Sequence, residues 1–193
     1  MASTSRVPVD ELLRRLSVSE YDAMIAAGIF SGDDRIELLE GYLVEKMTKS
    51  PAHSAATRLT RILLARLVGP GWYVDAQEPI TTGDSEPEPD VAVVRGGPRD
   101  HLERHPSASE VGLVVEVADA SLRRDRETKA RVYGRAGIPV YWIINVAART
   151  VEVHTEPHGD GYARSMTATD ADDIPLVLDG VRLAEVVVSD MLP

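Results

Sequence analysis

One acidic residue interrupts an otherwise apolar run in this sequence. Glu116 lies within Leu113-Val-Val-Glu-Val117, whose other members are aliphatic. Such runs are typical of a strand that is buried on both faces. Burying a carboxylate costs several kcal/mol unless a cation or hydrogen bonds compensate for the lost hydration. Glu116 is therefore either one half of a buried ion pair with an arginine or a ligand for a cation.

A second acidic residue, Asp90, comes directly before another apolar run, Val91–Val94. If the two predicted strands are neighbours, the carboxylates of Asp90 and Glu116 converge at one edge of a sheet. Two carboxylates suit Mg²⁺ or Mn²⁺, which prefer oxygen ligands. The chain has no cysteine, which excludes a disulfide scaffold, a thiolate zinc site and a cysteine nucleophile. Asp90 also follows a proline, so a turn or capping role is the alternative for this residue.

A possible cationic partner lies downstream, in Asp125-Arg-Glu-Thr-Lys129. On a helix, Asp125 and Lys129 are one turn apart and share a face. They could form an intrahelical salt bridge at the surface. Alternatively, Lys129 points at the carboxylates, where its ammonium would orient a water molecule or stabilise charge that grows on a phosphate.

Predicted helices and strands alternate along the chain, which favours an α/β (α+β) fold with a mixed central β-sheet flanked by helices. Helices are expected at Val9–Leu16, at Ser19–Ala27 with Ser19 as N-cap, at Pro51–Val68 with an apolar face of Ala55, Leu59, Ile62, Leu63 and Leu67, and at Arg126–Arg135 with Asp125 as N-cap. Strands are expected at Trp72–Ala76, Pro79–Thr81, Val91–Val94, Val111–Val117, Val140–Ile144, Thr150–Thr155, Tyr162–Thr167 and Pro175–Leu178, together with a hairpin that turns at Glu40-Gly41.

The length of 193 residues and the hydrophobic content of 44% predict one well-packed domain. We place it at residues 18–193, after an N-terminal tail and short helix at residues 1–17. The N-terminus has no apolar segment typical of a secretion signal, and no apolar run approaches the roughly 20 residues that a membrane helix needs. A cytoplasmic protein without membrane contact is expected.

The order and spacing of five motifs resemble the Uma-two family of endonucleases. The motifs are Arg35-Ile-Glu-Leu-Leu-Glu-Gly-Tyr-Leu-Val44, Pro89-Asp-Val-Ala-Val-Val94, Leu113-Val-Val-Glu-Val117, Arg124-Asp-Arg-Glu-Thr-Lys129 and Tyr133-Gly-Arg-Ala-Gly-Ile-Pro-Val-Tyr-Trp-Ile-Ile144. The resemblance runs from about Val18 to Tyr162. It implies the restriction-endonuclease-like fold of PD-(D/E)XK nucleases, with a mixed sheet between helices.

The resemblance also implies roles for individual residues. Asp90 and Glu116 match the two metal-binding acids of the superfamily, and Mg²⁺ or Mn²⁺ is the implied cofactor. The lysine usually found two residues after the second acid is absent, since position 118 is alanine, and Lys129 on the following helix fits its role. Glu37 would complete the metal shell or position water, and the Val117 carbonyl would add a ligand.

The remaining implied features concern His53 and the substrate. His53 would contact phosphate or carry a proton near neutral pH; the alternative is an ordinary residue at the start of a helix. Tyr133 and Trp142 are expected in the core. The implied substrate is nucleic acid, most simply DNA, and analogy with other such nucleases suggests a homodimer.

Three other functions are compatible with the same residues. The chain could be a catalytically silent domain that binds nucleic acid or a partner. It could be a metal-dependent phosphohydrolase of small substrates, which a narrow pocket would favour. It could also be a structural dimerising domain, in which case Glu116 should meet an arginine.

The formal net charge of −10 argues against a general nucleic-acid coat protein or a binder of anionic membranes. Its distribution is uneven. Residues 46–74 and 123–135 together hold 11 basic and 2 acidic residues, whereas the rest of the chain holds 10 basic and 29 acidic residues. Both basic segments flank the candidate site, which predicts weak, salt-sensitive and metal-dependent binding of nucleic acid.

Overall fold

A six-stranded mixed sheet forms the centre of the molecule, in a computed structural model that describes residues 13–30 and 34–193. The helices are α1 (Val18–Ala26), α2 (Pro51–Leu67), α3 (Leu122–Arg124) and α4 (Ala130–Arg135), with a π-helical segment, Asp125–Lys129, joining α3 to α4. The strands are β1 (Ile36–Leu39), β2 (Tyr42–Glu45), β3 (Trp72–Asp75), β4 (Val91–Arg95), β5 (Val111–Ala118), β6 (Val140–Asn145), β7 (Thr150–His158), β8 (Gly161–Thr169), β9 (Asp173–Leu178) and β10 (Val181–Val187).

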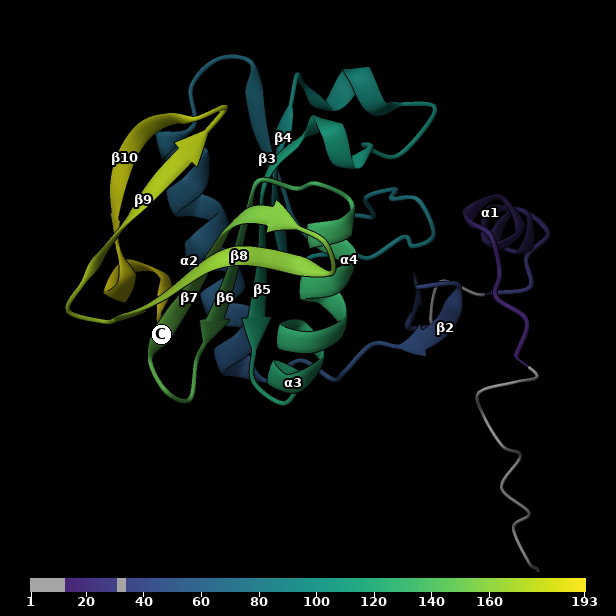
Figure 1. Cartoon of the computed structure of the whole chain (residues 1–193), viewed down its shortest axis with the longest axis horizontal. Helices are drawn as coiled ribbons and strands as arrows, with labels where there is room; N and C mark the ends of the chain where they lie inside the picture. The colour runs from purple at the N-terminus through teal and green to yellow at the C-terminus, as the bar shows by residue number, and fades with distance from the viewer. Residues whose placement is uncertain (1–12, 31–33) are drawn as a thin grey trace, which may run out of the picture.

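The sheet has the strand order β3-β4-β5-β6-β7-β8, and only β5 and β6 pair in parallel. Helix α2 lies on one side of it, and α3 and α4 lie on the other (Figure 1). The hairpins β1-β2 and β9-β10 are separate two-stranded sheets, and β1-β2 lies with α1 to one side of the main sheet (Figure 1). The predicted mixed sheet flanked by helices is confirmed.

Side-chain alternation along β5 separates two apolar layers. Leu113, Val115 and Val117 pack with α2, whereas Val114 and Ala118 pack with α4. This is the period of two of a strand with both faces covered. Glu116 alternates with Val114 and Ala118 on the same face of β5, so its side chain points toward the layer of α3 and α4. The sheet thereby directs a buried acid at a helix that carries cations.

Several predicted elements differ from the structure. Helix α1 begins one residue after Ser17, which forms a capping box with Glu20, so the N-cap is Ser17 and not Ser19. Residues 13–17 are not helical, and the rest of the predicted Val9–Leu16 helix lies outside the described residues. Pro79–Thr81 contributes only an isolated bridge from Thr81 to Ser107, and β10 was not predicted.

The prediction for the apolar face of α2 is confirmed only in part. Leu63 and Leu67 pack against the core, but the other two large members of that face do not. Leu59 and Ile62 are 38% and 42% exposed, whereas Ala56, Thr60 and Leu64 are fully buried. The small side chains of Ala56 and Thr60 allow the helix to lie close to the sheet. Apolar spacing identified the helix, but two adjacent stripes satisfy that spacing and only packing decides which one faces inward.

The helix after β5 also begins earlier than predicted. It starts at Leu122, so Asp125 lies inside it and is not its N-cap. Instead, the Ser121 hydroxyl donates to the Asp125 carboxylate at 2.6 Å. Within residues 13–30 and 34–193, the structure has no helix that is long and apolar enough to cross a membrane.

The Gly134→Ala substitution tests how closely α4 is packed. A Cβ atom on Gly134 would lie 2.3 Å from the carbonyl oxygen of Gly161 at the start of β8. We expect overpacking to lower the free energy of unfolding by about 1–3 kcal/mol, measured by urea denaturation. Gly69→Ala is the matched control, because no neighbouring atom lies within 4 Å of its added Cβ. Equal losses in the two variants would contradict this packing.

Candidate functional site

Asp90 is fixed at the start of β4 by two hydrogen-bond partners. Its Oδ2 accepts from the Val117 backbone N–H at 2.9 Å and lies 3.1 Å from the Nε2 of His53. Val91 pairs with Val115 in the antiparallel β4-β5 ladder, so Asp90 stands beside Glu116 at the end of β5. Burial opposes ionisation, but the hydrogen bond and charge of His53, the Val117 N–H and Lys129 outweigh it and lower the pKa of Asp90.

His53 reaches Asp90 from the first turn of α2. The Ser50 side chain caps this helix by accepting from the His53 backbone N–H at 3.1 Å, and Pro51 occupies the first turn. The Thr57 hydroxyl, one turn further along, donates to the His53 carbonyl at 3.0 Å. The imidazole is therefore buried and held against a carboxylate, as the proposed site role requires.

Glu116 meets a lysine and a tyrosine, and not an arginine. Its Oε1 accepts from the Lys129 Nζ at 2.8 Å and from the Tyr133 hydroxyl at 2.6 Å. All three side chains are buried. Burial, together with the nearby carboxylates of Asp125, Asp90 and Glu37, raises the pKa of Glu116, and Lys129 only partly offsets this. The structure therefore favours the inward-pointing alternative for Lys129 that the sequence left open.

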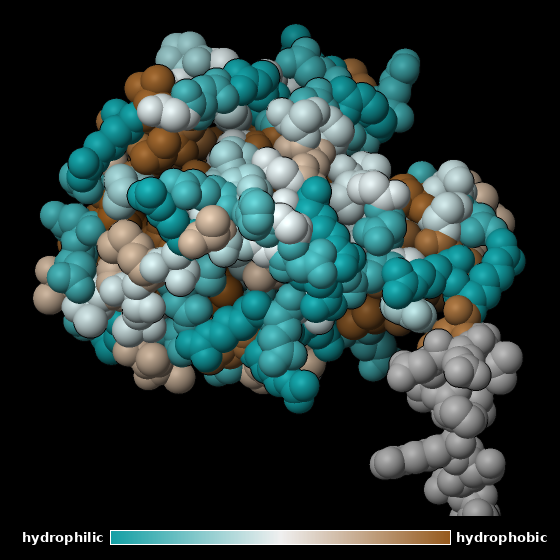
Figure 2. All heavy atoms as spheres, viewed as in Figure 1, coloured by the Kyte–Doolittle hydropathy of each residue, from teal (hydrophilic) through white to brown (hydrophobic). Residues whose placement is uncertain are grey.

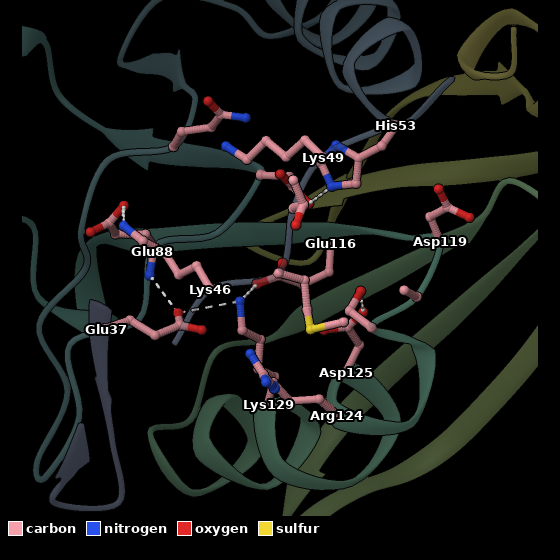
Figure 3. A pocket seen from close by; sticks show the side chains of 16 residues that line it. Glu37, Lys46, Lys49, His53, Glu88, Glu116, Asp119, Arg124, Asp125 and Lys129 are labelled. Carbon is pink, nitrogen blue, oxygen red and sulfur yellow. Dashed lines mark hydrogen bonds and ion pairs between the residues drawn. The ribbon is translucent and has the colours of Figure 1, made fainter. Parts of the chain in front are cut away.

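Lys129 stands between two acids from different parts of the chain. Its Nζ lies 2.8 Å from Glu116 on β5 and 3.4 Å from Glu37 on β1. Figure 3 marks both ion pairs with dashed lines. Burial disfavours the ammonium, but Glu116, Glu37 and Asp125 outweigh that cost and raise the pKa of Lys129. The π-helical segment places Asp125 and Lys129 on the buried side together, and π-helical turns often occur at functional sites.

Glu37 connects the β1-β2 hairpin to the site. Its carboxylate is buried and also accepts from the Glu88 backbone N–H at 3.2 Å. The Glu88 side chain in turn pairs with Lys46 at 2.5 Å. The five predicted site residues, Glu37, His53, Asp90, Glu116 and Lys129, all line one pocket (Figure 3). Val117 does not line this pocket, and it contacts the site through the backbone N–H that donates to Asp90.

The pocket carries more acids than cations. Its lining includes six carboxylates, from Glu37, Glu88, Asp90, Glu116, Asp119 and Asp125. It also includes four cations, from Lys46, Lys49, Arg124 and Lys129. The formal excess of two negative charges equals the charge of one divalent cation, and every acidic donor is a hard oxygen ligand.

The arrangement still requires one change before it could hold an ion. No three acidic or histidine side chains of the described residues converge closely enough to coordinate a metal as they stand. In this arrangement the Oε1 of Glu116 accepts from Lys129 and Tyr133. The donor set therefore fits Mg²⁺ or Mn²⁺ in its chemistry, provided that Glu116 exchanges its ammonium partner for the ion.

Comparison with known proteins identifies the family and the fold of the chain. The Uma2 family model, described as "Putative restriction endonuclease", matches residues 18–185, which include all these site residues. The chain belongs to the Uma2 family. A solved structure from Anabaena variabilis, titled as a putative nuclease of DUF820, superposes with a TM-score of 0.69 at 16% identity. That comparison covers 91% of this chain and 97% of the other. A search of curated proteins gives no match.

For this Uma2 chain, sequence reasoning did not identify several residues of the site. Tyr133 lies in the core, as expected, but its hydroxyl also binds Glu116, which was not predicted. It lies four residues after Lys129, a spacing that could have indicated a shared helix face. Glu88 and Asp119 lie two and three residues from predicted ligands, but short spacing alone does not show which side chains turn inward. Trp142 is a core residue, as predicted.

The Lys129→Met substitution should show how far the buried acids depend on the ammonium. Removing it leaves Glu116 and Glu37 without a counter-charge, and we expect the free energy of unfolding at pH 8 to fall by about 3–5 kcal/mol. The folded-state pKa of Glu116 lies above its ordinary value of 4.5 and should rise further in the variant. The unfolded chain releases its proton at lower pH, so the loss should be smallest near pH 5 and grow toward pH 8.

Urea denaturation of the variant and the native chain at pH 5 and pH 8 measures this difference. Lys46→Met is the matched control, because the Lys46–Glu88 pair is partly exposed and should contribute less than about 1 kcal/mol. A loss in Lys129→Met that is equal at both pH values would contradict the ionic role of Lys129.

Proposed function

We propose that this chain is a metal-dependent endonuclease that hydrolyses phosphodiester bonds in DNA. The observation that carries the proposal is the meeting of Asp90, Glu116 and Lys129 in one pocket at the edge of the sheet. Two acids at the ends of neighbouring strands, with a lysine from the following helical segment beside them, suit phosphoryl chemistry. Membership of the Uma2 family, which is described as nucleases, supports the reaction class.

The proposed metal site uses Asp90 and Glu116, with Glu37 and the Val117 carbonyl as further oxygen ligands. Mg²⁺ or Mn²⁺ is the proposed cofactor. When bound, such an ion polarises a phosphoryl oxygen and lowers the pKa of water. Asp90 is the better prepared ligand, because its pKa is lowered and it is held in place by Val117 and His53.

Lys129 would stabilise negative charge during the reaction, and His53 would supply a proton. Water would attack phosphorus and release a proton to solvent as the new P–O bond forms, and the P–O bond to the leaving sugar oxygen would break. Lys129 can donate to a phosphate oxygen, where negative charge grows, once it no longer pairs with Glu116. His53 orients Asp90 through Nε2 and can supply the proton that the leaving oxygen takes up.

The size of the pocket favours a polymeric substrate over a small one. Its free volume is about 60 Å³, whereas pockets that enclose a small organic ligand usually measure about 300–1,000 Å³. The space suits a metal ion and an oxygen of one phosphate, with the remainder of the substrate outside. The pocket is narrow, as expected for a phosphohydrolase of small substrates, but it is too small to enclose an organic ligand, so a phosphohydrolase that encloses its substrate is disfavoured.

Cleavage of supercoiled and linear DNA in Mg²⁺, Mn²⁺ or EDTA tests the proposal. Asp90→Asn and Glu116→Gln should each lower the metal-dependent rate by about a hundredfold or more, since even partners outside the ligand shell contribute about 10–100-fold. Glu127→Gln is the matched control, because Glu127 is exposed and pairs with Arg123 at the surface.

Two results would count against the proposal. Cleavage by Asp90→Asn at the native rate would remove Asp90 from the site, and full activity in EDTA would exclude the metal. Metal binding by calorimetry without any cleavage would favour the catalytically silent alternative.

A further inference from the structure

The two basic segments of the chain differ in how they are paired. In residues 123–135, five of the six cations contact carboxylates: Arg123–Glu127, Arg126–Glu152, Lys129–Glu116, Arg131–Glu40 and Arg135–Asp160. Arg124 donates instead to the Glu45 carbonyl. The α3–α4 face is largely hydrophilic (Figure 2), but its positive charge is neutralised within the protein. The expected basic groove is therefore absent on this side of the described structure.

On helix α2, by contrast, the arginines have no carboxylate partners in the described structure. Arg58, Arg61 and Arg66 are all exposed, and they have no ion pair or hydrogen bond within residues 13–30 and 34–193. Residues 46–74 contain no acid, so α2 offers no carboxylate at the adjacent helical positions. Most other arginines of this acidic protein, such as Arg149 and Arg164, bind carboxylates.

The unpaired arginines lie on a helix that begins at the candidate site. His53, in the first turn of α2, contacts Asp90, and Lys49, just before the helix, lines the pocket. At 1.5 Å per residue, Arg58 and Arg66 lie about 10 and 22 Å along the axis from Pro51. One DNA strand has a phosphate for about every 3.4 Å of its axis, so α2 can follow several successive phosphates.

We infer that the outer face of α2, formed by Arg58, Arg61 and Arg66, binds the phosphate backbone of the nucleic acid whose cleavage we propose. This inference rests on the proposed function. Guanidinium groups suit the partner because they bind phosphate oxygens in a bidentate manner. The exposed Leu59 and Ile62 lie between the arginines, so a second copy of the chain is the competing occupant.

The test compares two triple variants with the same change in net charge. Arg58→Gln/Arg61→Gln/Arg66→Gln removes the proposed contacts. Arg149→Gln/Arg164→Gln/Arg182→Gln is the matched control, because these exposed arginines pair with Asp170, Glu156 and Glu185. Binding of a fluorescent 30-base-pair duplex is measured over a range of salt concentrations with Ca²⁺, another cation that prefers oxygen ligands, and cleavage is measured in parallel with Mg²⁺.

We expect the α2 triple variant to bind at least about tenfold more weakly at 100 mM salt, with a log–log salt slope shallower by about 2–3. The control should stay within about twofold of the native chain, since its arginines are not phosphate contacts. Arg58→Lys/Arg61→Lys/Arg66→Lys keeps the charges and should restore most of the slope. Urea denaturation checks that each variant is folded.

The possible failures are distinguishable. Unchanged binding by the α2 triple variant, or equal weakening in both triple variants, overturns the inference about α2. If cleavage still depends on Asp90 in that case, the proposed function stands. A native chain that neither binds nor cuts the duplex overturns both. Loss of self-association in the ultracentrifuge, with duplex binding intact, assigns the face to a second copy and also overturns the inference.

Discussion

The buried ammonium of Lys129 is the interaction on which the arrangement of the site depends. An isolated charge in a protein interior is costly, so Lys129 requires counter-charges, and it finds Glu116 on β5 and Glu37 on β1. The same contacts join the main sheet, the β1-β2 hairpin and the helix after β5. The acids also depend on the lysine, because burial and the neighbouring carboxylates raise the pKa of Glu116 and of Asp125, and Lys129 opposes both shifts.

This mutual dependence gives the lysine two successive roles in the proposed mechanism. Without an ion, Lys129 neutralises Glu116 and keeps the carboxylates together. With an ion, Glu116 would bind the metal, and the ammonium would remain close by to contact phosphate. Asp90 is organised separately by His53 and the Val117 N–H, so one ligand is ready before the ion arrives while the other must exchange its partner.

The sequence was informative where local pattern and burial coincide. The sequence places Glu116 within one aliphatic run and Asp90 directly before a second. This pattern predicted that the two acids meet at one end of the sheet, and the β4-β5 register places them there. The sequence was less informative where distant segments decide the outcome. Arg131 pairs with Glu40, 91 residues away, and such pairs neutralise a segment that looks strongly basic in the sequence. The inward face of α2 likewise depends on which stripe packs on the sheet, and the π-helical turn has no clear local signal.

A crystal structure of the native chain soaked in Mn²⁺ tests the central claim most directly, because anomalous scattering locates the ion. We predict Mn²⁺ bound by the carboxylates of Asp90 and Glu116, with Lys129 moved away from Glu116 and still beside Glu37. A saturated crystal with no Mn²⁺ at these carboxylates, and with the Lys129–Glu116 pair intact, would contradict the account.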